Sequence, residues 1–240
     1  MHTHLLVVGG SGYVGRLVLP ILAERFHLRV FDRVPPSNPA WEYVQGDVTD
    51  PEALHAAAQG MELLLYLAMG TLRNLSEHQF PVPSYDVNVK GVHLALDAAV
   101  RAGIRRAVYT SSLSVYDGHL STLSGQTDRE DVIPEPRAVY GFTKLLGEEV
   151  CRYFHRTHNL PVLVLRLHSP VSREQWHALH DPTKVQAHTS APDLARALIA
   201  ALELDHSGFE VIHVTGDYTG RAYRHEKAKR LLGWEPLERP

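Results

Sequence analysis

The stretch Leu5-Leu6-Val7-Val8-Gly9-Gly10-Ser11-Gly12-Tyr13-Val14-Gly15 decides the fold of this chain. Four consecutive apolar residues are typical of a buried parallel strand, and they end directly at Gly9. Residues 13–25, which follow the glycines, carry apolar side chains at helical spacing. Glycines spaced as Gly9-x-x-Gly12-x-x-Gly15 permit a tight turn, close approach of backbone N–H groups to a pyrophosphate, and close packing of helix on strand. The stretch therefore predicts a dinucleotide-binding strand, turn and helix.

Strands and helices alternate through the rest of the chain. Short apolar runs predict strands at 5–8, 28–31, 41–44, 63–68, 106–111 and 162–167. Helical spacing predicts helices at 13–25, 51–60, 85–101 and 139–158. This alternation is typical of an α/β protein with a doubly wound parallel sheet, the Rossmann arrangement.

The pattern changes after Leu167. One helix at 192–204, one strand at 211–214 and a final helix at 225–232 are predicted there. We therefore expect residues 1–167 to form an NAD-binding Rossmann domain. Residues 168–240 are expected to form a small substrate-binding cap packed on the same domain, and a cap this small favours a small substrate.

The composition of the 240 residues excludes several classes of protein. Lys and Arg total 24 and Asp and Glu total 27, a net charge of −3 that gives no support for a nucleic-acid or membrane-surface partner. Cys151 is the only cysteine, which excludes an intramolecular disulfide framework and cysteine-rich metal sites. The 16 histidines are scattered, so no metal site is expected. No apolar run reaches the roughly 18 residues of a membrane-spanning helix, and a cytoplasmic protein is expected.

A carboxylate follows each of the next two predicted strands. Asp32, at the end of the second strand, could accept hydrogen bonds from the adenosine ribose hydroxyls and repel a 2′-phosphate, which favours NAD over NADP. Its neighbour Arg33 could instead pair with a 2′-phosphate, so NADP remains possible. Asp47 follows the third strand. It could reach the adenine amino group, or it could cap the helix that begins at Pro51.

A tyrosine, a lysine and a serine carry the predicted chemistry. Tyr140 and Lys144 lie four residues apart, on one face of the predicted helix 139–158. A phenol is a poor base at neutral pH, but a neighbouring ammonium and the positive nicotinamide ring favour its ionised form. Ser112 follows the strand 106–111 at the edge where such sheets bind ligands. Its hydroxyl could hold the substrate oxygen while Tyr140 transfers a proton.

In combination these motifs resemble the extended short-chain dehydrogenase/reductases, the NAD-dependent epimerase/dehydratase family. The matching stretches are 9–15, Asp32, 46–48, 67–68, 88–91, 108–116, 140–144, Arg166, 193–195 and 229–236. The resemblance implies that Ser112, Tyr140 and Lys144 are catalytic, and that Asn88 supports the active site. The cofactor contacts it implies are Gly9, Gly12, Tyr13, Val14, Gly15, Asp32, Arg33, Asp47, Val48, Leu67, Ala68, Tyr140 and Lys144.

The resemblance implies a substrate that is a sugar, a sugar acid or a nucleotide sugar. Ser169 stands where nucleotide-sugar enzymes of the group usually carry Asn, and the short segment after it is more similar to uronate dehydrogenases. The stretch 113–116 is closer to the epimerase pattern, so a dehydrogenase, an epimerase and a dehydratase all remain open. The candidate substrate contacts are Thr71, Ser112, His168 and Ser169.

Two further expectations concern the class of protein and its assembly. The alternative to an enzyme is a catalytically idle NAD(P)-binding redox sensor or regulatory protein of the same fold. Its usual signature is loss of the tyrosine or the lysine, and both residues are present here. In the family the helices 85–101 and 139–158 often form a dimer contact, so a homodimer is possible.

Overall fold

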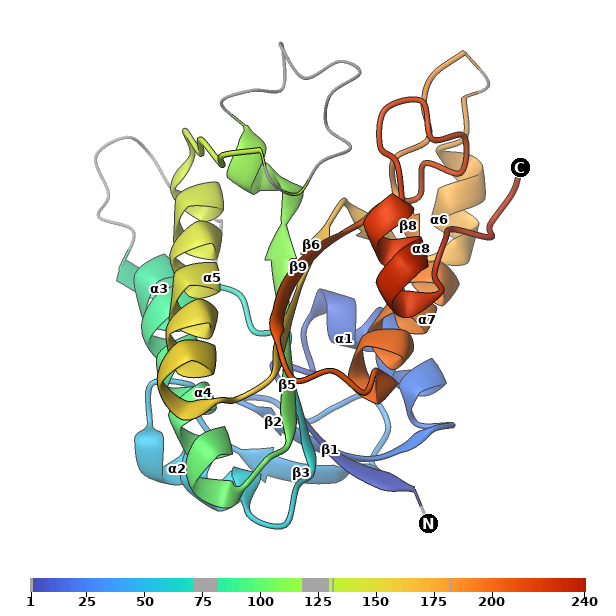
Figure 1. Ribbon diagram of the computed structural model, residues 1–240. Helices are drawn as coiled ribbons and strands as arrows, with labels where there is room; N and C mark the ends of the chain where they lie inside the picture. Colours follow the sequence, from blue (N-terminus) through green and yellow to red (C-terminus); the bar gives the residue numbers. More distant parts are fainter. Residues whose placement is uncertain (1, 71–81, 118–129, 131, 182) are drawn as a thin grey trace.

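A parallel seven-stranded sheet forms the centre of the molecule (Figure 1). The computed structural model describes residues 2–70, 82–117, 130, 132–181 and 183–240. The strands of the sheet are β1 (Thr3–Val8), β2 (Phe26–Asp32), β3 (Glu42–Gln45), β4 (Leu63–Tyr66), β5 (Arg106–Ser112), β6 (Val162–Leu167) and β9 (Phe209–Val214). Their order is β3-β2-β1-β4-β5-β6-β9. β2 and β3 therefore lie on one side of β1, and β4, β5, β6 and β9 lie on the other.

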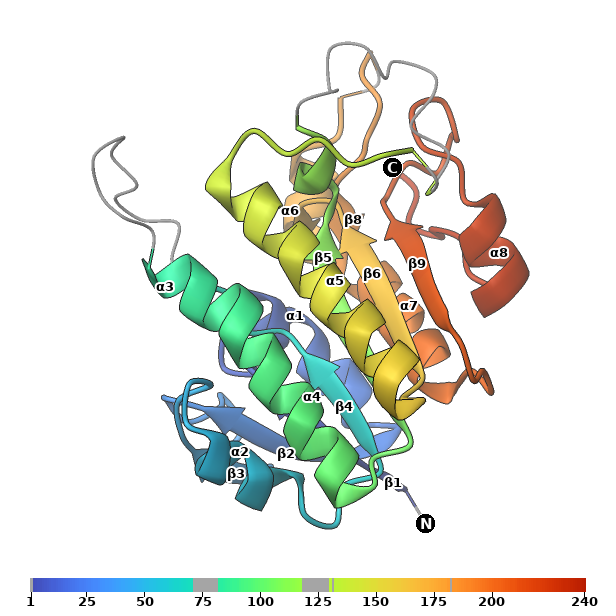
Figure 2. The same cartoon turned by 60° about the vertical axis from the view of Figure 1, so that its left-hand side comes forward.

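Helices cover both faces of the sheet (Figures 1 and 2). One face packs against α1 (Tyr13–Leu22), α7 (Ala191–Glu203) and α8 (Glu226–Leu232). The other packs against α2 (Pro51–Ala58), α4 (Gly91–Ala102) and α5 (Val139–His158). The remaining short elements are α3 (Val82–Tyr85), η1 (Asp86–Lys90), η2 (Leu113–Tyr116), β7 (Pro170–Val171), α6 (Arg173–Ala178) and β8 (Thr189–Ser190). Two layers of helices on one parallel sheet confirm the predicted α/β fold class.

The apolar run of β1 is explained by burial on both faces. Leu5 and Val7 belong to the core on the α1 side, whereas Leu6 and Val8 belong to the core on the α5 side. Successive side chains of a strand point to opposite faces, so a strand covered on both faces needs apolar residues at every position.

The predicted helix at 85–101 differs from the observed structure. The chain forms the short α3, then five π-helical residues in η1, and only then the regular α4. The π-helical turn contains Asn88, which is fully buried and hydrogen-bonded to two other segments. π-Helical turns are rare, and here the turn accompanies the two hydrogen bonds of Asn88 to Gly70 and Thr143.

The C-terminal part of the chain contributes to the sheet itself. β9 lies parallel to β6, with Val162 opposite Phe209 and Leu167 opposite Val214. α7 from the same part supplies buried apolar residues to the core on the α1 side. Residues 168–240 are therefore integrated with the sheet, and their role in substrate binding remains a prediction. Among the described residues, no helix is both long enough and apolar enough to cross a membrane.

Candidate active site

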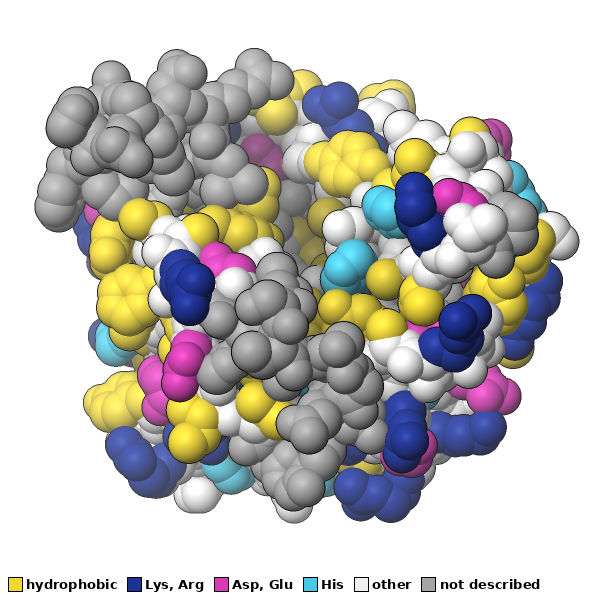
Figure 3. Space-filling view, turned by 90° about the horizontal axis from the view of Figure 1, so that it is seen from above, with side chains coloured by type: hydrophobic (Ala, Val, Ile, Leu, Met, Phe, Trp, Pro, Cys, Tyr) yellow, Lys and Arg dark blue, Asp and Glu magenta, His cyan; other side chains and the backbone are white. Residues whose placement is uncertain are grey.

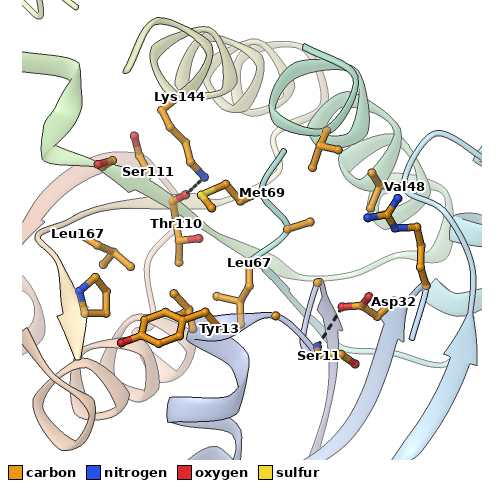
Figure 4. A pocket seen from close by; sticks show the side chains of 18 of the residues that line it. Ser11, Tyr13, Asp32, Val48, Leu67, Met69, Thr110, Ser111, Lys144 and Leu167 are labelled. Carbon is orange, nitrogen blue, oxygen red and sulfur yellow. Dashed lines mark hydrogen bonds between the residues drawn. The ribbon is translucent and has the colours of Figure 1, made fainter. Parts of the chain in front are cut away.

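A pocket of about 560 Å³ lies where the strands of the sheet end (Figure 4). It runs along the switch point between β1 and β4, where strand order reverses and where such sheets bind ligands. The view from above shows this edge hollowed, with hydrophobic and histidine side chains along its wall (Figure 3). The predicted site residues that line the pocket are Gly9, Gly12, Tyr13, Val14, Asp32, Arg33, Asp47, Val48, Leu67, Ala68, Ser112, Tyr140, Lys144 and Ser169.

The glycine loop between β1 and α1 forms one side of the pocket. Gly9 has φ of +83°, and a Cβ atom there would lie 2.4 Å from the Ala68 backbone. Gly12 is the N-cap residue of α1, and no side chain accepts a hydrogen bond there from the N–H groups of the first turn. Gly15 does not line the pocket; a Cβ on it would meet the Gly10 carbonyl oxygen at 1.9 Å, so glycine there allows close packing. The loop thus has the shape and the partial positive charge that favour a phosphate.

Asp32 lies at the opposite end of the pocket from Lys144, and Asp47 also lines the pocket (Figure 4). The carboxylate of Asp32 accepts a hydrogen bond from the Ser11 N–H at 3.0 Å, which ties the glycine loop to β2 (Figure 4). Asp47 accepts hydrogen bonds from the backbone and hydroxyl of Thr49, and these lower the pKa of Asp47 below its usual value. The cap of α2 is Asp50, not Asp47. Asp47 therefore does not cap the helix and lines the pocket.

Ser112 and Tyr140 lie together at the end of β5. Ser112 begins η2, and its hydroxyl oxygen accepts the Ser114 N–H at 3.1 Å. Tyr140 stands in the first turn of α5 and lines the same pocket as Ser112, whose hydroxyl donates to Ser114 Oγ at 3.1 Å. Burial raises the pKa of Tyr140, and the nearby Ser112 side chain partly opposes this effect. A hydroxyl pair beside the glycine loop is an arrangement that can bind and deprotonate an alcohol.

Lys144 points from α5 into the same pocket. Its Nζ donates a hydrogen bond to the Thr110 carbonyl oxygen at 2.8 Å and lies 5.1 Å from the centre of the Tyr109 ring. Burial lowers the pKa of Lys144 to about 8. We expected Lys144 to lower the pKa of Tyr140. In this structure burial dominates at Tyr140, and the Lys144 ammonium is held by the Thr110 carbonyl.

Close contacts hold the first turn of α5 on η2. A Cβ atom on Gly141 would lie 2.2 Å from the Ser114 carbonyl oxygen. The carboxylate of Asp117, just after η2, accepts the backbone N–H groups of Arg137 and Ala138 ahead of α5. Together these contacts fix Tyr140, the residue before Gly141, against the strand end that carries Ser112.

Asn88 joins three segments behind the pocket. Its side-chain oxygen accepts the Gly70 N–H at 3.0 Å, and its amide nitrogen donates to the Thr143 hydroxyl at 2.9 Å. Thr143 in turn donates to the Tyr140 carbonyl oxygen at 3.1 Å. The contacts agree with the supporting role that the resemblance implies for Asn88, which remains a prediction.

The predicted substrate contacts behave differently from one another. Ser169 lines the pocket in a left-handed conformation with φ of +38°, which is uncommon for a residue other than glycine. His168 does not line the pocket; its ring lies 6.3 Å from the His188 ring and 5.6 Å from the Tyr223 ring. Burial lowers the pKa of His168. Thr71 lies outside the described residues.

Sequence reasoning missed a buried polar network directly beneath the pocket. Its members are Glu148, Arg166, Tyr116 and His213, together with Ser111, which also lines the pocket. One signal was available, because Glu148 follows Lys144 by four residues and so shares its helix face. Within the described segments, no cluster of three or more histidine, cysteine or acidic side chains could hold a metal ion.

The sequence of the chain matches a known family over most of its length. The model of the NAD dependent epimerase/dehydratase family aligns with residues 5–192, from β1 to the start of α7. The chain belongs to this family. The match includes the glycine loop and the positions of Ser112, Tyr140 and Lys144. The match confirms the predicted membership of this family. The enzymes of the family depend on NAD, as predicted for the cofactor.

Curated relatives in this family differ in how much of the chain they match. A 3 beta-hydroxysteroid dehydrogenase/Delta 5→4-isomerase of Mycobacterium tuberculosis is 37% identical over 150 residues, covering 56% of this chain and 40% of the relative. The NAD-dependent glucose-6-phosphate dehydrogenase of Haloferax volcanii is 25% identical over 269 residues, covering 99% of this chain and 94% of the relative. The chain thus matches about two fifths of the mycobacterial enzyme and nearly all of the haloarchaeal one.

Solved structures share the fold at low sequence identity. A mutated uronate dehydrogenase has a TM-score of 0.81 at 22% identity, covering 99% of this chain and 82% of that one. MoeE5 in complex with UDP-glucuronic acid and NAD has a TM-score of 0.78 at 22% identity, covering 98% and 94%. These likenesses concern the fold, and they agree with the predicted doubly wound sheet.

Proposed function

We propose that this protein is an NAD-dependent oxidoreductase or epimerase that acts on a hydroxyl-bearing carbon of a sugar, a sugar acid or a nucleotide sugar. The observation that carries the proposal is that Ser112, Tyr140 and Lys144 line the same pocket as the glycine loop. A proton-transferring phenol, a hydroxyl that can orient the substrate and a phosphate-binding loop are the parts that such a reaction needs.

The residues of the pocket fit NAD. The glycine loop provides a cradle in which a Cβ at Gly9 would collide with Ala68, and the N–H groups at the start of α1, which no side chain caps, would bind the phosphates. Asp32 would bind the adenosine ribose, and Lys144 the nicotinamide ribose. When bound, NAD supplies the ring that accepts or returns a hydride.

The side chains of this chain would handle the proton. Ser112 would hold the substrate oxygen, and Tyr140 would take the hydroxyl proton as the hydride leaves the carbon. Because burial raises the pKa of Tyr140, ionisation of the phenol needs nearby positive charge. The Lys144 ammonium and the positive nicotinamide ring would both provide it.

The choice of sugar-type substrates rests on likeness to other proteins. MoeE5 was solved with UDP-glucuronic acid, and the haloarchaeal relative is a glucose-6-phosphate dehydrogenase. Ser169 at the edge of the pocket departs from the nucleotide-sugar pattern, which favours a small free sugar or sugar acid. The mycobacterial relative is named for a hydroxysteroid, so a steroid belongs in any substrate panel.

A substrate panel tests the proposal. The protein is mixed with NAD and, in turn, with free sugars, sugar phosphates, uronates, UDP-sugars and a 3β-hydroxysteroid, while NADH absorbance is followed. Because an epimerase regenerates its NAD, the UDP-sugars are also analysed for their epimers by chromatography.

We expect turnover of at least one sugar-type compound, and we expect Tyr140→Phe to reduce it by at least about 100-fold with NADH affinity nearly unchanged. Full activity of Tyr140→Phe would contradict the assignment of the tyrosine. Turnover of the steroid alone would refute the sugar class. No turnover together with an NADH-dependent protein partner would favour a redox sensor.

A further inference from the structure

Three successive turns of α5 each bring a polar side chain to β5. Tyr140 lines the pocket with Ser112, Lys144 Nζ donates to the Thr110 carbonyl oxygen at 2.8 Å, and the Ser111 hydroxyl donates to Glu148 Oε1 at 2.5 Å. Residues four apart on a helix share a face, so the three side chains form one row. The first two belong to the candidate active site, and the third has no assigned role.

Glu148 is buried together with a positive partner. Its side chain is 1% exposed, and Arg166 of β6 donates to both carboxylate oxygens, with Nε at 2.9 Å and a terminal nitrogen at 2.6 Å. Arg166 also donates to the Tyr116 hydroxyl, which lies 3.2 Å from His213 Nε2. A buried ion pair often adds little stability relative to apolar residues of similar volume. Its presence under the pocket therefore suggests a contribution other than stability.

Glu148 is the ionised neighbour of Lys144. The groups that interact with Lys144 are Tyr109 from β5 and Glu148 and Cys151 from α5, and Tyr140 precedes it by one helical turn. Burial raises the pKa of Tyr109, Tyr140 and Cys151, so all three are neutral at pH 7. Burial lowers the pKa of Lys144, and Cys151 and then Glu148 act in the opposite direction. Because the Cys151 thiol is neutral at pH 7, the carboxylate of Glu148 is the negative charge that remains there.

We propose that Glu148 is a positioning residue for this site: its buried carboxylate, held by Arg166, ties α5 to Ser111 and places a negative charge one helical turn from Lys144. The catalytic consequence rests on the proposed function, because the Lys144 ammonium is the group that would stabilise the Tyr140 phenolate. The effect on Lys144 itself does not require turnover.

Glu148→Gln tests the charge. Glutamine keeps the volume and can still accept the Ser111 hydrogen bond, but it removes the negative charge and leaves Arg166 unpaired. Both changes make Lys144 lose its proton at lower pH, so we expect the alkaline limb of the kcat/KM profile to move down by about one pH unit. An alkaline limb at the same pH as in the wild-type protein would overturn the proposal.

Ser111→Ala tests the tie between α5 and β5 if Glu148→Gln does not fold. Arg166 still holds both oxygens of Glu148 in this variant, so no buried charge loses its partner. We expect kcat to fall about 10-fold while the Kd for NADH stays within about twofold of the wild-type value.

The control for loss of a buried serine hydrogen bond is Ser190→Ala, which caps α7 through the Asp193 N–H and, unlike Ser111, does not line the pocket. It should lose stability without losing kcat. If Ser111→Ala, like Ser190→Ala, loses only stability and keeps its kcat, the positioning role is refuted.

The pH dependence of NADH binding separates this inference from the proposed function. NADH fluorescence is titrated from pH 6 to pH 10 with the wild-type protein and with Glu148→Gln. If the variant loses NADH binding at a lower midpoint pH than the wild-type protein and neither turns over any substrate, the role of Glu148 is supported and the proposed enzymatic function is refuted. Turnover with identical pH profiles in the two proteins would refute the role of Glu148 and leave the enzyme in place.

Discussion

At the scale of single residues, Asp32 faces both the glycine loop and the pocket. One carboxylate oxygen accepts the Ser11 N–H at 3.0 Å, and the other lies 3.4 Å from the Val34 nitrogen. The residue thus orders the loop that would hold the pyrophosphate and places a negative charge where an adenosine ribose would lie. Arg33 lines the same end of the pocket, so a 2′-phosphate would meet one charge of each sign.

Asp32→Ala is expected to change the choice of cofactor. The variant loses a charged hydrogen-bond acceptor for the ribose, so NADH binding should weaken by about 10- to 100-fold. NADPH binding should weaken less, because the variant also loses the repulsion of the 2′-phosphate. Fluorescence titration with both cofactors measures the ratio.

The control for this prediction is Asp50→Ala, which removes the cap of α2 but no residue of the pocket. It should reduce stability by about 1 kcal/mol and leave the cofactor ratio unchanged. An unchanged ratio in Asp32→Ala would remove Asp32 from its proposed role.

At the scale of elements, the approach of α5 to η2 decides whether the site forms. The helix begins at Val139, and its next two residues are the catalytic candidate Tyr140 and the glycine that allows close contact. Gly147, two turns further on, permits a similar approach, since a Cβ there would lie 2.3 Å from the Tyr109 hydroxyl. Small residues on this face let α5 rest on β5 and η2 with little space between them.

Gly141→Ala tests this packing. In an ordinary helix interior, alanine is more favourable than glycine by about 1 kcal/mol. Here the added methyl group would meet the Ser114 carbonyl oxygen at 2.2 Å, so the first turn of α5 must shift. We expect a lower melting temperature and a turnover reduced by about 10-fold or more, since Tyr140 moves away from Ser112.

Thr157→Ala, an exposed position in the last turn of the same helix, serves as the control. It should retain full turnover and nearly full stability. A Gly141→Ala protein with higher stability and full activity would show that α5 does not rest closely on η2.

At the scale of the whole molecule, the two ends of the chain share one sheet and one core. β9 pairs with β6 along its full length, and α7 and α8 complete the core that α1 begins. The part expected to act as a substrate cap therefore also closes the edge of the cofactor-binding sheet. The predicted homodimer and the substrate role of residues 168–240 remain predictions.

Removal of residues 168–240 is expected to prevent folding of the remainder. The truncation would leave β6 as an open edge and expose the apolar face of the sheet that α7 covers. We expect residues 1–167 to aggregate and to lack a cooperative unfolding transition, as measured by size-exclusion chromatography and circular dichroism beside the full chain. A monomeric, NADH-binding fragment would instead show that residues 1–167 fold independently.

Much of the architecture could be predicted from local patterns. The bounds of α5 and β6 agree with the predicted 139–158 and 162–167, because an amphipathic helix and a fully buried strand each leave a clear periodic pattern. The interruption of the helix around Asn88 could not be predicted, since the π-helical turn accompanies hydrogen bonds to Gly70 and Thr143 from distant parts of the chain. The role of β9 as the seventh strand was also missed, because pairing depends on which neighbour is available.

The sequence by itself determined the alternation of strands and helices, the glycine loop and the family, since these depend on residue spacing along the chain. Only the tertiary structure decided the surroundings of the candidate catalytic groups. It brought Ser112 to Tyr140, directed Lys144 to the Thr110 carbonyl, and placed the Glu148–Arg166 ion pair beneath them. Burial and contacts between distant segments set the protonation of these groups, and such effects exist only once the chain has folded.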